Sequence, residues 1–182
     1  MLQSSSNHDS ESAIRKLLHL DSLRAGGTCI RNEKGWLDNE RKIEYSWTIC
    51  INHSFRGPLY LFAVKFGANT FRGSDNVEEL LLGLMHLNTA EVADRSYTDS
   101  YLEDFTDPIK EIRLFQLFEG DSHFTLDGVS YTIHIKATNI ESKLAFSNPQ
   151  SEYWKAIETD VWKLARQLAQ QSGNEFFLNF VK

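Results

Sequence analysis

The sequence predicts a single α+β domain in which a mainly antiparallel sheet of about five or six strands packs with three helices. Its 182 residues are 41% hydrophobic and 24% charged, which is typical of one globular domain with a buried core. Alternating and continuous apolar runs between residues 43 and 66 indicate paired strands. Apolar residues at helical spacing near both ends of the chain and in its middle indicate the helices.

The chain is expected to begin with a disordered lead-in, residues 1–10, followed by the single domain, residues 11–182. The lead-in (MLQSSSNHDS) is polar and serine-rich and has no hydrophobic period. From Ser10 onward, apolar residues recur at helical spacing: Ile14, Leu17, Leu18, Leu20 and Leu23. Gly26-Gly27 stops this pattern, so we expect a first amphipathic helix that ends before these glycines.

Three strand regions are expected after the first helix. The segment from Thr28 to Leu37 is interpreted as a short strand pair around Lys34-Gly35. Ile43 to Ile51 alternates apolar with polar residues, which predicts a strand with one buried face. Leu59 to Phe66 is apolar on both sides, as expected of a central strand covered on both faces. The connection, residues 52–58, makes the last two strands an antiparallel hairpin.

A second helix is predicted after Gly73. Asp75 can cap the free amide groups at its start, and Glu78 can reach back to the cap in a capping box. The residues expected to face the core are apolar and recur at helical spacing: Val77, Leu80, Leu81, Leu84 and Met85.

Strands are expected again in the second half of the chain. Ile112 to Phe118 is predicted as a long strand, and Phe124 to Ala137 as a hairpin. Asp127-Gly128 closes this hairpin, because that dipeptide is a strong signal for a two-residue turn.

The last helix is predicted to open at Asn148-Pro149, a cap residue followed by proline at the first helical position. Its core stripe consists of apolar residues at helical spacing: Trp154, Ile157, Val161, Leu164, Ala165 and Leu168. Gly173 ends it. The apolar tail, residues 176–181, is expected to pack against the core as a short strand or helical turn.

Several features bear on where the protein acts. Residues 1–20 contain no continuous apolar run of signal-peptide length. The longest apolar run, Leu80 to Met85, is far shorter than the roughly 20 residues that cross a bilayer. The two cysteines, Cys29 and Cys50, fit a reduced compartment better than a disulfide framework. We therefore expect a cytoplasmic protein without membrane association.

The net charge of −6 is concentrated in residues 89–107. This segment, called the acidic segment below, holds six carboxylates against Arg95 alone, a net charge of −5: Glu91, Asp94, Asp99, Glu103, Asp104 and Asp107. Basic residues are scattered over the rest of the chain and outnumbered, so nucleic acid is not expected as a partner.

Aromatic residues recur at four-residue intervals within the acidic segment: Tyr97, Tyr101 and Phe105. A helical turn there would present an aromatic stripe flanked by negative charge. Aromatic side chains supply contact area and clustered carboxylates attract a basic partner, so the segment predicts a protein-binding surface. The alternative is a solvated acidic loop whose aromatic residues pack into the core.

The predicted hairpin at Asp127-Gly128 sets His123 opposite Thr132 and makes His123 a diagonal neighbour of His134 on a polar face. Two imidazoles beside Lys136 suit acid–base chemistry on a phosphodiester. The alternative is a hydrated sheet face without catalytic function. Because a zinc site needs three or four ligands and no third is indicated, we expect neither a metal nor a cofactor.

One stretch resembles a known kind of protein. The run Phe66-Gly67, followed by Gly73-Ser74-Asp75-Asn76-Val77-Glu78-Glu79-Leu80-Leu81-Leu82, resembles the strand-to-helix step of small bacterial α+β domains of unknown function. Some of these domains look like immunity proteins that neutralise a partner toxin. The resemblance covers about 20 residues of 182 and contains no catalytic signature.

The leading functional hypothesis is therefore a non-enzymatic inhibitor or immunity-type protein that binds a basic protein partner through the acidic segment. The alternative is a small hydrolase or nucleotide-handling enzyme that uses His123 and His134 as an acid–base pair. A third hypothesis is a structural subunit of a larger assembly. The sequence leaves the oligomeric state open.

Overall fold

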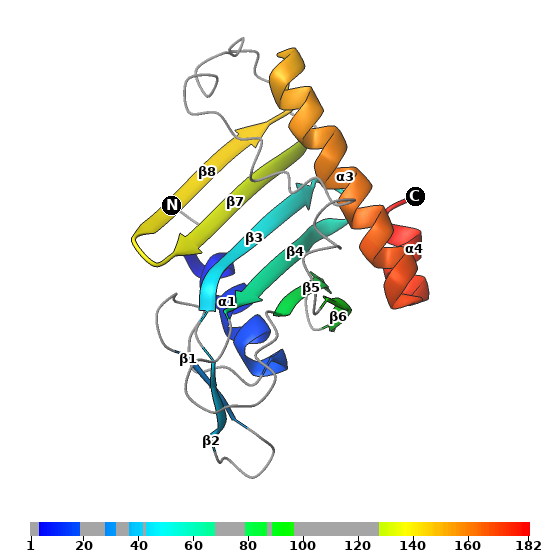
Figure 1. The fold of residues 1–182 in the computed structure, drawn as a ribbon. Helices are drawn as coiled ribbons and strands as arrows, with labels where there is room; N and C mark the ends of the chain where they lie inside the picture. The colour runs from blue at the N-terminus through cyan, green and yellow to red at the C-terminus, as the bar shows by residue number, and fades with distance from the viewer. Residues whose placement is uncertain are drawn as a thin grey trace.

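The computed structural model describes residues 4–18, 28–31, 37–41, 43–67, 79–86, 89–96 and 128–182. Within these ranges six strands form one antiparallel sheet in the order β6-β5-β4-β3-β7-β8, and two others form a separate small sheet (Figure 1). The strands are β1 (Thr28–Arg31), β2 (Leu37–Arg41), β3 (Ile43–His53), β4 (Gly57–Phe66), β5 (Glu79–His86), β6 (Thr89–Ser96), β7 (Val129–Ala137) and β8 (Ile140–Ser147). The helices are α1 (Ser4–Leu17), α3 (Glu152–Ser172) and α4 (Glu175–Phe180). The predicted α+β class is confirmed.

The hairpin of β3 and β4 forms the centre of the large sheet, as predicted. In β4, every residue from Leu59 to Phe66 is buried, so this strand is covered on both faces. In β3, the predicted alternation buries Trp47, Ile49 and Ile51 on one face. A register shift between Ile43 and Tyr45 places Ile43 in the core on the opposite face, where the alternation alone would not put it.

Helices α3 and α4 cover one face of the sheet (Figure 1). All six residues of the predicted stripe of α3 are buried there: Trp154, Ile157, Val161, Leu164, Ala165 and Leu168. Gly173 ends α3 with a φ of 64°, a left-handed conformation that glycine adopts at little cost. The apolar tail packs as predicted, because Phe177 and Phe180 of α4 and the following Val181 are buried in the same core.

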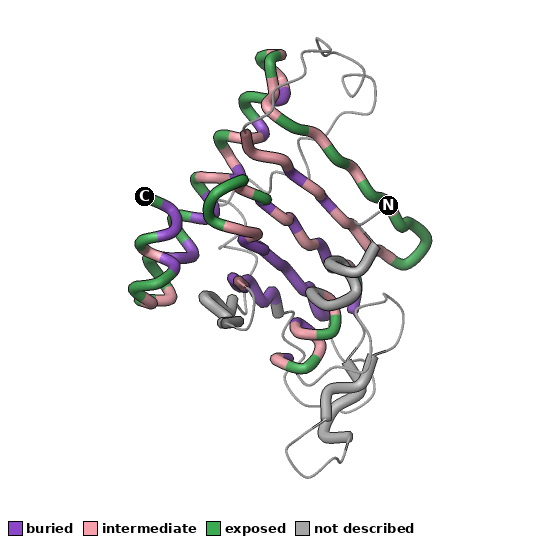
Figure 2. The backbone as a smooth tube through the Cα atoms, turned by 180° about the vertical axis from the view of Figure 1, so that it is seen from behind, coloured by how far each residue is buried: buried purple, intermediate pink, exposed green. Residues whose placement is uncertain are grey.

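Helix α1 covers part of the opposite face. Ile14 and Leu18 are buried there against apolar residues of β3, β4 and β5: Ile43, Tyr60, Phe62, Val64, Phe66, Leu81 and Met85. Figure 2 shows the sheet from this side, with buried residues concentrated at its centre and more exposed residues along β8. The apolar contact of α1 is thus confined to one part of the face.

The bounds of α1 differ from the prediction. The helix begins at Ser4, so residues 4–10, expected to belong to a disordered lead-in, are helical. It ends at Leu17, and residues 19–27, which include Leu20 and Leu23, lie outside the described residues. Serine disfavours a helix interior only weakly, and packing of Ile14 and Leu18 outweighs that preference. No helix in the described part of the chain is long and apolar enough to cross a membrane.

The predicted second helix is wrong at residues 79–86, which form strand β5 between β4 and β6. The strand directs Leu80, Leu82 and Leu84 into the core beneath α3. Leu81 and Met85 enter the core beneath α1 on the opposite face. A run that is apolar at nearly every position suits a two-sided strand as well as a helix, and pairing with β4 and β6 decides between them. Residues 68–78 lie outside the described residues.

The predicted hairpin at Asp127-Gly128 is also wrong. Both edges of β7 are occupied, by β3 and by β8, and its hairpin partner is β8 across the turn at residues 138–139. Gly128 is explained by crowding, because a Cβ atom at this position would lie 1.8 Å from Oδ1 of Asn148. The segment from Phe124 to Asp127 and the predicted strand 112–118 lie outside the described residues.

Helix α3 also begins at a different cap residue from the one predicted. Asn148, expected to cap this helix, instead accepts a hydrogen bond from the backbone N–H of Val129 through Oδ1, at 3.1 Å. Ser151 is the cap, and its hydroxyl accepts from the backbone N–H of Trp154 at 3.3 Å. Asn and Ser are both good residues for a helix start, but the side chain of Asn148 is already engaged with the first residue of β7, so Ser151 caps the helix.

The assignment of β5 can be tested with Leu82, which is 1% exposed but lies outside the predicted helical stripe. Leu82→Ala is expected to lower the free energy of unfolding by about 2–5 kcal/mol, because it leaves a cavity beneath α3. Phe55→Ala is the control, since Phe55 is 81% exposed, and its effect should stay within about 0.5 kcal/mol. Urea denaturation measures both. Equal stability of the two variants would contradict a buried strand here.

Candidate functional site

The acidic segment starts on the edge strand β6. Glu91 and Asp94 belong to this strand and are registered opposite Leu84 and Leu82 of β5. The first eight residues of the segment are therefore extended, and the predicted helical turn around Tyr97, Tyr101 and Phe105 lies outside the described residues. The other predicted binding residues lie outside the described residues: Tyr97, Asp99, Tyr101, Glu103, Asp104, Phe105 and Asp107.

The polar face predicted for β7 exists, on the side of the sheet that carries α1. Tyr131 and Ile133 are buried on the face beneath α3, as the alternation predicts. On the other face, Thr132, His134 and Lys136 are only half-buried. Antiparallel pairing then places Thr48 of β3 and residues of β8 beside them.

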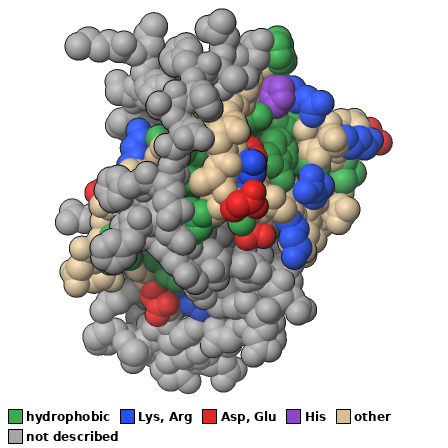
Figure 3. Space-filling model, turned by 90° about the horizontal axis from the view of Figure 1, so that it is seen from above, with side chains coloured by type: hydrophobic (Ala, Val, Ile, Leu, Met, Phe, Trp, Pro, Cys, Tyr) green, Lys and Arg blue, Asp and Glu red, His purple; other side chains and the backbone are tan. Residues whose placement is uncertain are grey.

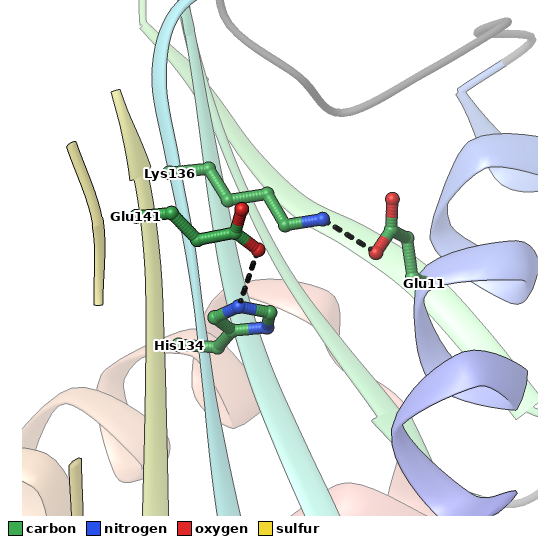
Figure 4. Close-up of polar contacts among 4 residues, drawn as sticks. All are labelled: Glu11, His134, Lys136 and Glu141. Carbon is green, nitrogen blue, oxygen red and sulfur yellow. Dashed lines mark hydrogen bonds and ion pairs between the residues drawn. The ribbon is translucent and has the colours of Figure 1, made fainter. Parts of the chain in front are cut away.

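Two side-chain contacts organise this polar face (Figure 4). Nε2 of His134 lies 3.1 Å from Oε1 of Glu141, on the neighbouring strand β8. Nζ of Lys136 donates to Oε2 of Glu11 at 2.7 Å, which ties β7 to helix α1. The His134–Glu141 pair is the more exposed, because 67% of the Glu141 side chain is accessible against 30% for Glu11. We therefore expect the Lys136–Glu11 contact, which holds α1 against the sheet, to contribute more to stability than the His134–Glu141 contact.

The predicted pairing of His134 with His123 depended on the hairpin at Asp127-Gly128. The register that made them neighbours is wrong, and His123 lies outside the described residues. The partner of His134 is the carboxylate of Glu141, which sequence reasoning missed. The available signal was the alternation of residues 140–147, which is typical of a strand. If that strand follows β7 after a turn at residues 138–139, Glu141 lies opposite Lys136.

Within the described residues no group of three or more His, Cys, Asp or Glu side chains is placed to hold a metal ion. His134 contacts Glu141 and Lys136 contacts Glu11, and these two contacts join neighbouring elements.

A hydrogen-bonded network lies between β7 and α3. The hydroxyl of Tyr131 donates to Oε1 of Glu158 at 2.5 Å and accepts from Nε1 of Trp162 at 2.8 Å. Burial, followed by the hydrogen bond to Glu158, raises the pKa of Tyr131 well above its ordinary value. The network keeps a buried hydroxyl satisfied and fixes the register of α3 on the sheet.

Cys50 is a free thiol on the α1 side of β3. Burial raises its pKa from the ordinary value of 9.0 to about 11, and a hydrogen bond with Tyr60 opposes this in part. A thiol that stays protonated is a poor nucleophile, so Cys50 acts as a packing residue. Cys29 lies in β1, and this strand pairs with β2 in the small sheet and not with β3, which carries Cys50.

Aromatic side chains gather where the β3–β4 turn meets α4. The ring of His86 contacts that of Phe176 at a tilt of 34°, with centroids 4.9 Å apart, and its Nδ1 lies 2.7 Å from the carbonyl oxygen of Pro58. Arg56 donates from Nη1 to the carbonyl oxygen of Phe180 at 2.7 Å. Figure 3 shows a face on which exposed hydrophobic side chains lie beside a histidine and basic side chains. These contacts anchor the turn to the last helix.

Comparisons with known proteins give no assignment. No model of a protein family matches the chain, and no curated protein is significantly similar to it.

The raised pKa values predict loss of stability in alkali. Unfolded cysteine ionises near its ordinary pKa of 9.0, whereas folded Cys50 keeps its proton up to about 11. The unfolded state therefore binds fewer protons, and the free energy of unfolding should fall as pH rises from 9.0 to about 11. Tyr131 adds to this fall above its ordinary pKa of 10.0.

Urea denaturation across this pH range tests the assignment. Cys50→Ala should flatten the early part of the fall, and Tyr131→Phe the later part. Ser147→Ala, an exposed substitution on β8, is the control and should follow the wild type. If the Cys50→Ala profile is parallel to the wild type from the outset, the thiol is not the group that titrates.

Proposed function

We propose that this protein is a non-enzymatic, inhibitor-type binding protein whose acidic segment engages a basic protein partner. An immunity-type protein that neutralises a basic toxin is the specific form of this proposal. The observation that carries it is the confinement of a net charge of −5, out of −6 for the whole chain, to residues 89–107.

The position of β6 supports this function. A strand at the sheet edge is accessible to another protein in a way that a central strand is not. Glu91 and Asp94 lie on this edge strand. Two like charges along it oppose pairing with another acidic strand, and they attract a positively charged surface. The same residues thus limit self-association at this edge and select the sign of the partner.

The tyrosines complete the interface. Charge raises the rate of encounter and suppresses wrong partners, but buried aromatic residues supply much of the affinity in protein interfaces. Tyr97 and Tyr101 follow β6 directly in the chain and are interleaved with Asp99 and Glu103. In this proposal the carboxylates form the charged rim and the tyrosines the anchors.

The alternative function, a hydrolase or nucleotide-handling enzyme, depended on a predicted hairpin that β7 does not form. It required His123 and His134 as neighbours on one hairpin, and β7 pairs instead with β3 and β8. We therefore do not propose it.

The test compares two variants with equal loss of charge. Asp99→Asn, Glu103→Gln and Asp104→Asn together alter the acidic segment, while Glu152→Gln, Asp160→Asn and Glu175→Gln alter α3 and α4. A basic protein retained by the immobilised wild type from its native source is purified, and its affinity is measured by calorimetry at several salt concentrations. The first variant should weaken binding at least tenfold and reduce the salt dependence, and the control should change it little.

Two results would contradict the proposal. One is equal weakening by both triple variants, which would mean that only net charge matters. The other is a purified partner that is acidic or that binds the acidic-segment variant as tightly as the wild type.

A further inference from the structure

Strand β8 is the outermost strand at the other end of the sheet (Figure 1). It pairs with β7 without a register shift, from Ser130 opposite Ser147 to Ala137 opposite Ile140. On its outer side, none of the strands in the described ranges pairs with it. An edge of this kind presents a row of backbone N–H and C=O groups to another strand.

The two edges of the sheet differ in their suitability for pairing with a further strand. The ladder of β5 and β6 is interrupted by a register shift between Leu82 and Gly83, and its edge carries the like charges Glu91 and Asp94. Strand β8 has neither feature. It is regular, contains no proline and carries one charge of each sign, Glu141 and Lys143.

The spacing of these two charges specifies a register. Glu141 and Lys143 lie two residues apart on one face of β8, and both are exposed. If two copies of β8 run antiparallel about a two-fold axis at Ser142, each Glu141 lies directly opposite Lys143 of the second copy. An axis at Lys143 would instead oppose two like charges, which destabilises a strand pair.

The opposite face of β8 favours the same register. Ile140 is 63% exposed, so its apolar side chain can gain burial from a second strand at this edge. With the axis at Ser142, each Ile140 lies opposite Leu144 of the second copy. Leu144 is half-buried and already packs against the core beneath α3, so the pair would extend that core across the two-fold axis.

We propose that two copies of this chain associate through their β8 strands, antiparallel and centred on Ser142, so that two six-stranded sheets join into one. Such an interface is isologous, because the same residues contact each other twice. A single added strand pair is expected to bury less surface than a standard protein interface, so the dimer is expected to be weak and concentration-dependent. The proposal concerns a different edge from the acidic segment and stands or falls independently of it.

Charge reversal tests the register. Lys143→Glu places Glu141 opposite a glutamate twice, and it should weaken the dimer at least about tenfold in sedimentation velocity. Glu141→Lys should do the same. The double variant Glu141→Lys/Lys143→Glu exchanges the charges and should restore the dimer to within a few-fold of the wild type. Lys155→Glu, an equal charge change on the exposed side of α3, should have little effect.

Cross-linking locates the axis. In a chain without Cys29 and Cys50, Ser142→Cys should form a disulfide-linked dimer, because opposed Cα atoms in an antiparallel pair lie within disulfide range. Ser147→Cys, far from the axis, should remain unlinked. A wild type that stays monomeric up to about 1 mM would overturn the proposal. So would a dimer that survives Lys143→Glu unchanged or that links through Leu144→Cys instead.

Discussion

The burial of both faces of β4 is the constraint on which the fold depends. From Leu59 to Phe66 this strand has no exposed side, and even Lys65 is only 7% exposed. Pairing with β3 and β5 satisfies its backbone groups, but its side chains require an apolar layer on each face. Helices α3 and α4 supply one layer and α1 supplies the other. The placement of helices on both faces of the sheet follows from this need for two covers.

Where the hydrophobic period is unambiguous, the sequence predicted the structure. The alternation in β3, the continuous apolar run of β4 and the 3.6-residue stripe of α3 each match one element only. Residues 80–85 match two kinds of element, because nearly every position is apolar and both a helix and a two-sided strand bury such a run. Pairing with β4 decides in favour of the strand, and that pairing is a long-range property that no local pattern contains. The turn next to β7 was predicted wrongly for a similar reason, because residues 138–139 carry a weaker turn signal in the sequence than Asp127-Gly128.

The α1 side of the sheet explains why the candidate site was predicted only in part. Alternation correctly put His134 and Lys136 on a polar face, because a strand with Tyr131 and Ile133 in the core must direct its other residues away from it. Their partners could not be predicted in this way. Glu141 depends on the register of β8, and Glu11 depends on where α1 lies across the sheet. Each partner becomes visible only when separate elements are placed together in three dimensions.

The chemistry of the two sheet edges separates two modes of recognition. Interior strands of the sheet have backbone groups that are satisfied on both sides, so their charges affect packing, whereas charges on an edge strand decide which chain can approach. Two like charges on β6 repel an identical edge and attract a cationic surface. Strand β8 carries one charge of each sign, so it repels neither an identical edge nor a cationic surface. Because these charges lie two residues apart, an antiparallel copy of the same strand is their best electrostatic complement. Because the two edges lie at opposite ends of the six-stranded order, a basic partner at β6 and a second copy at β8 would not compete for the same surface.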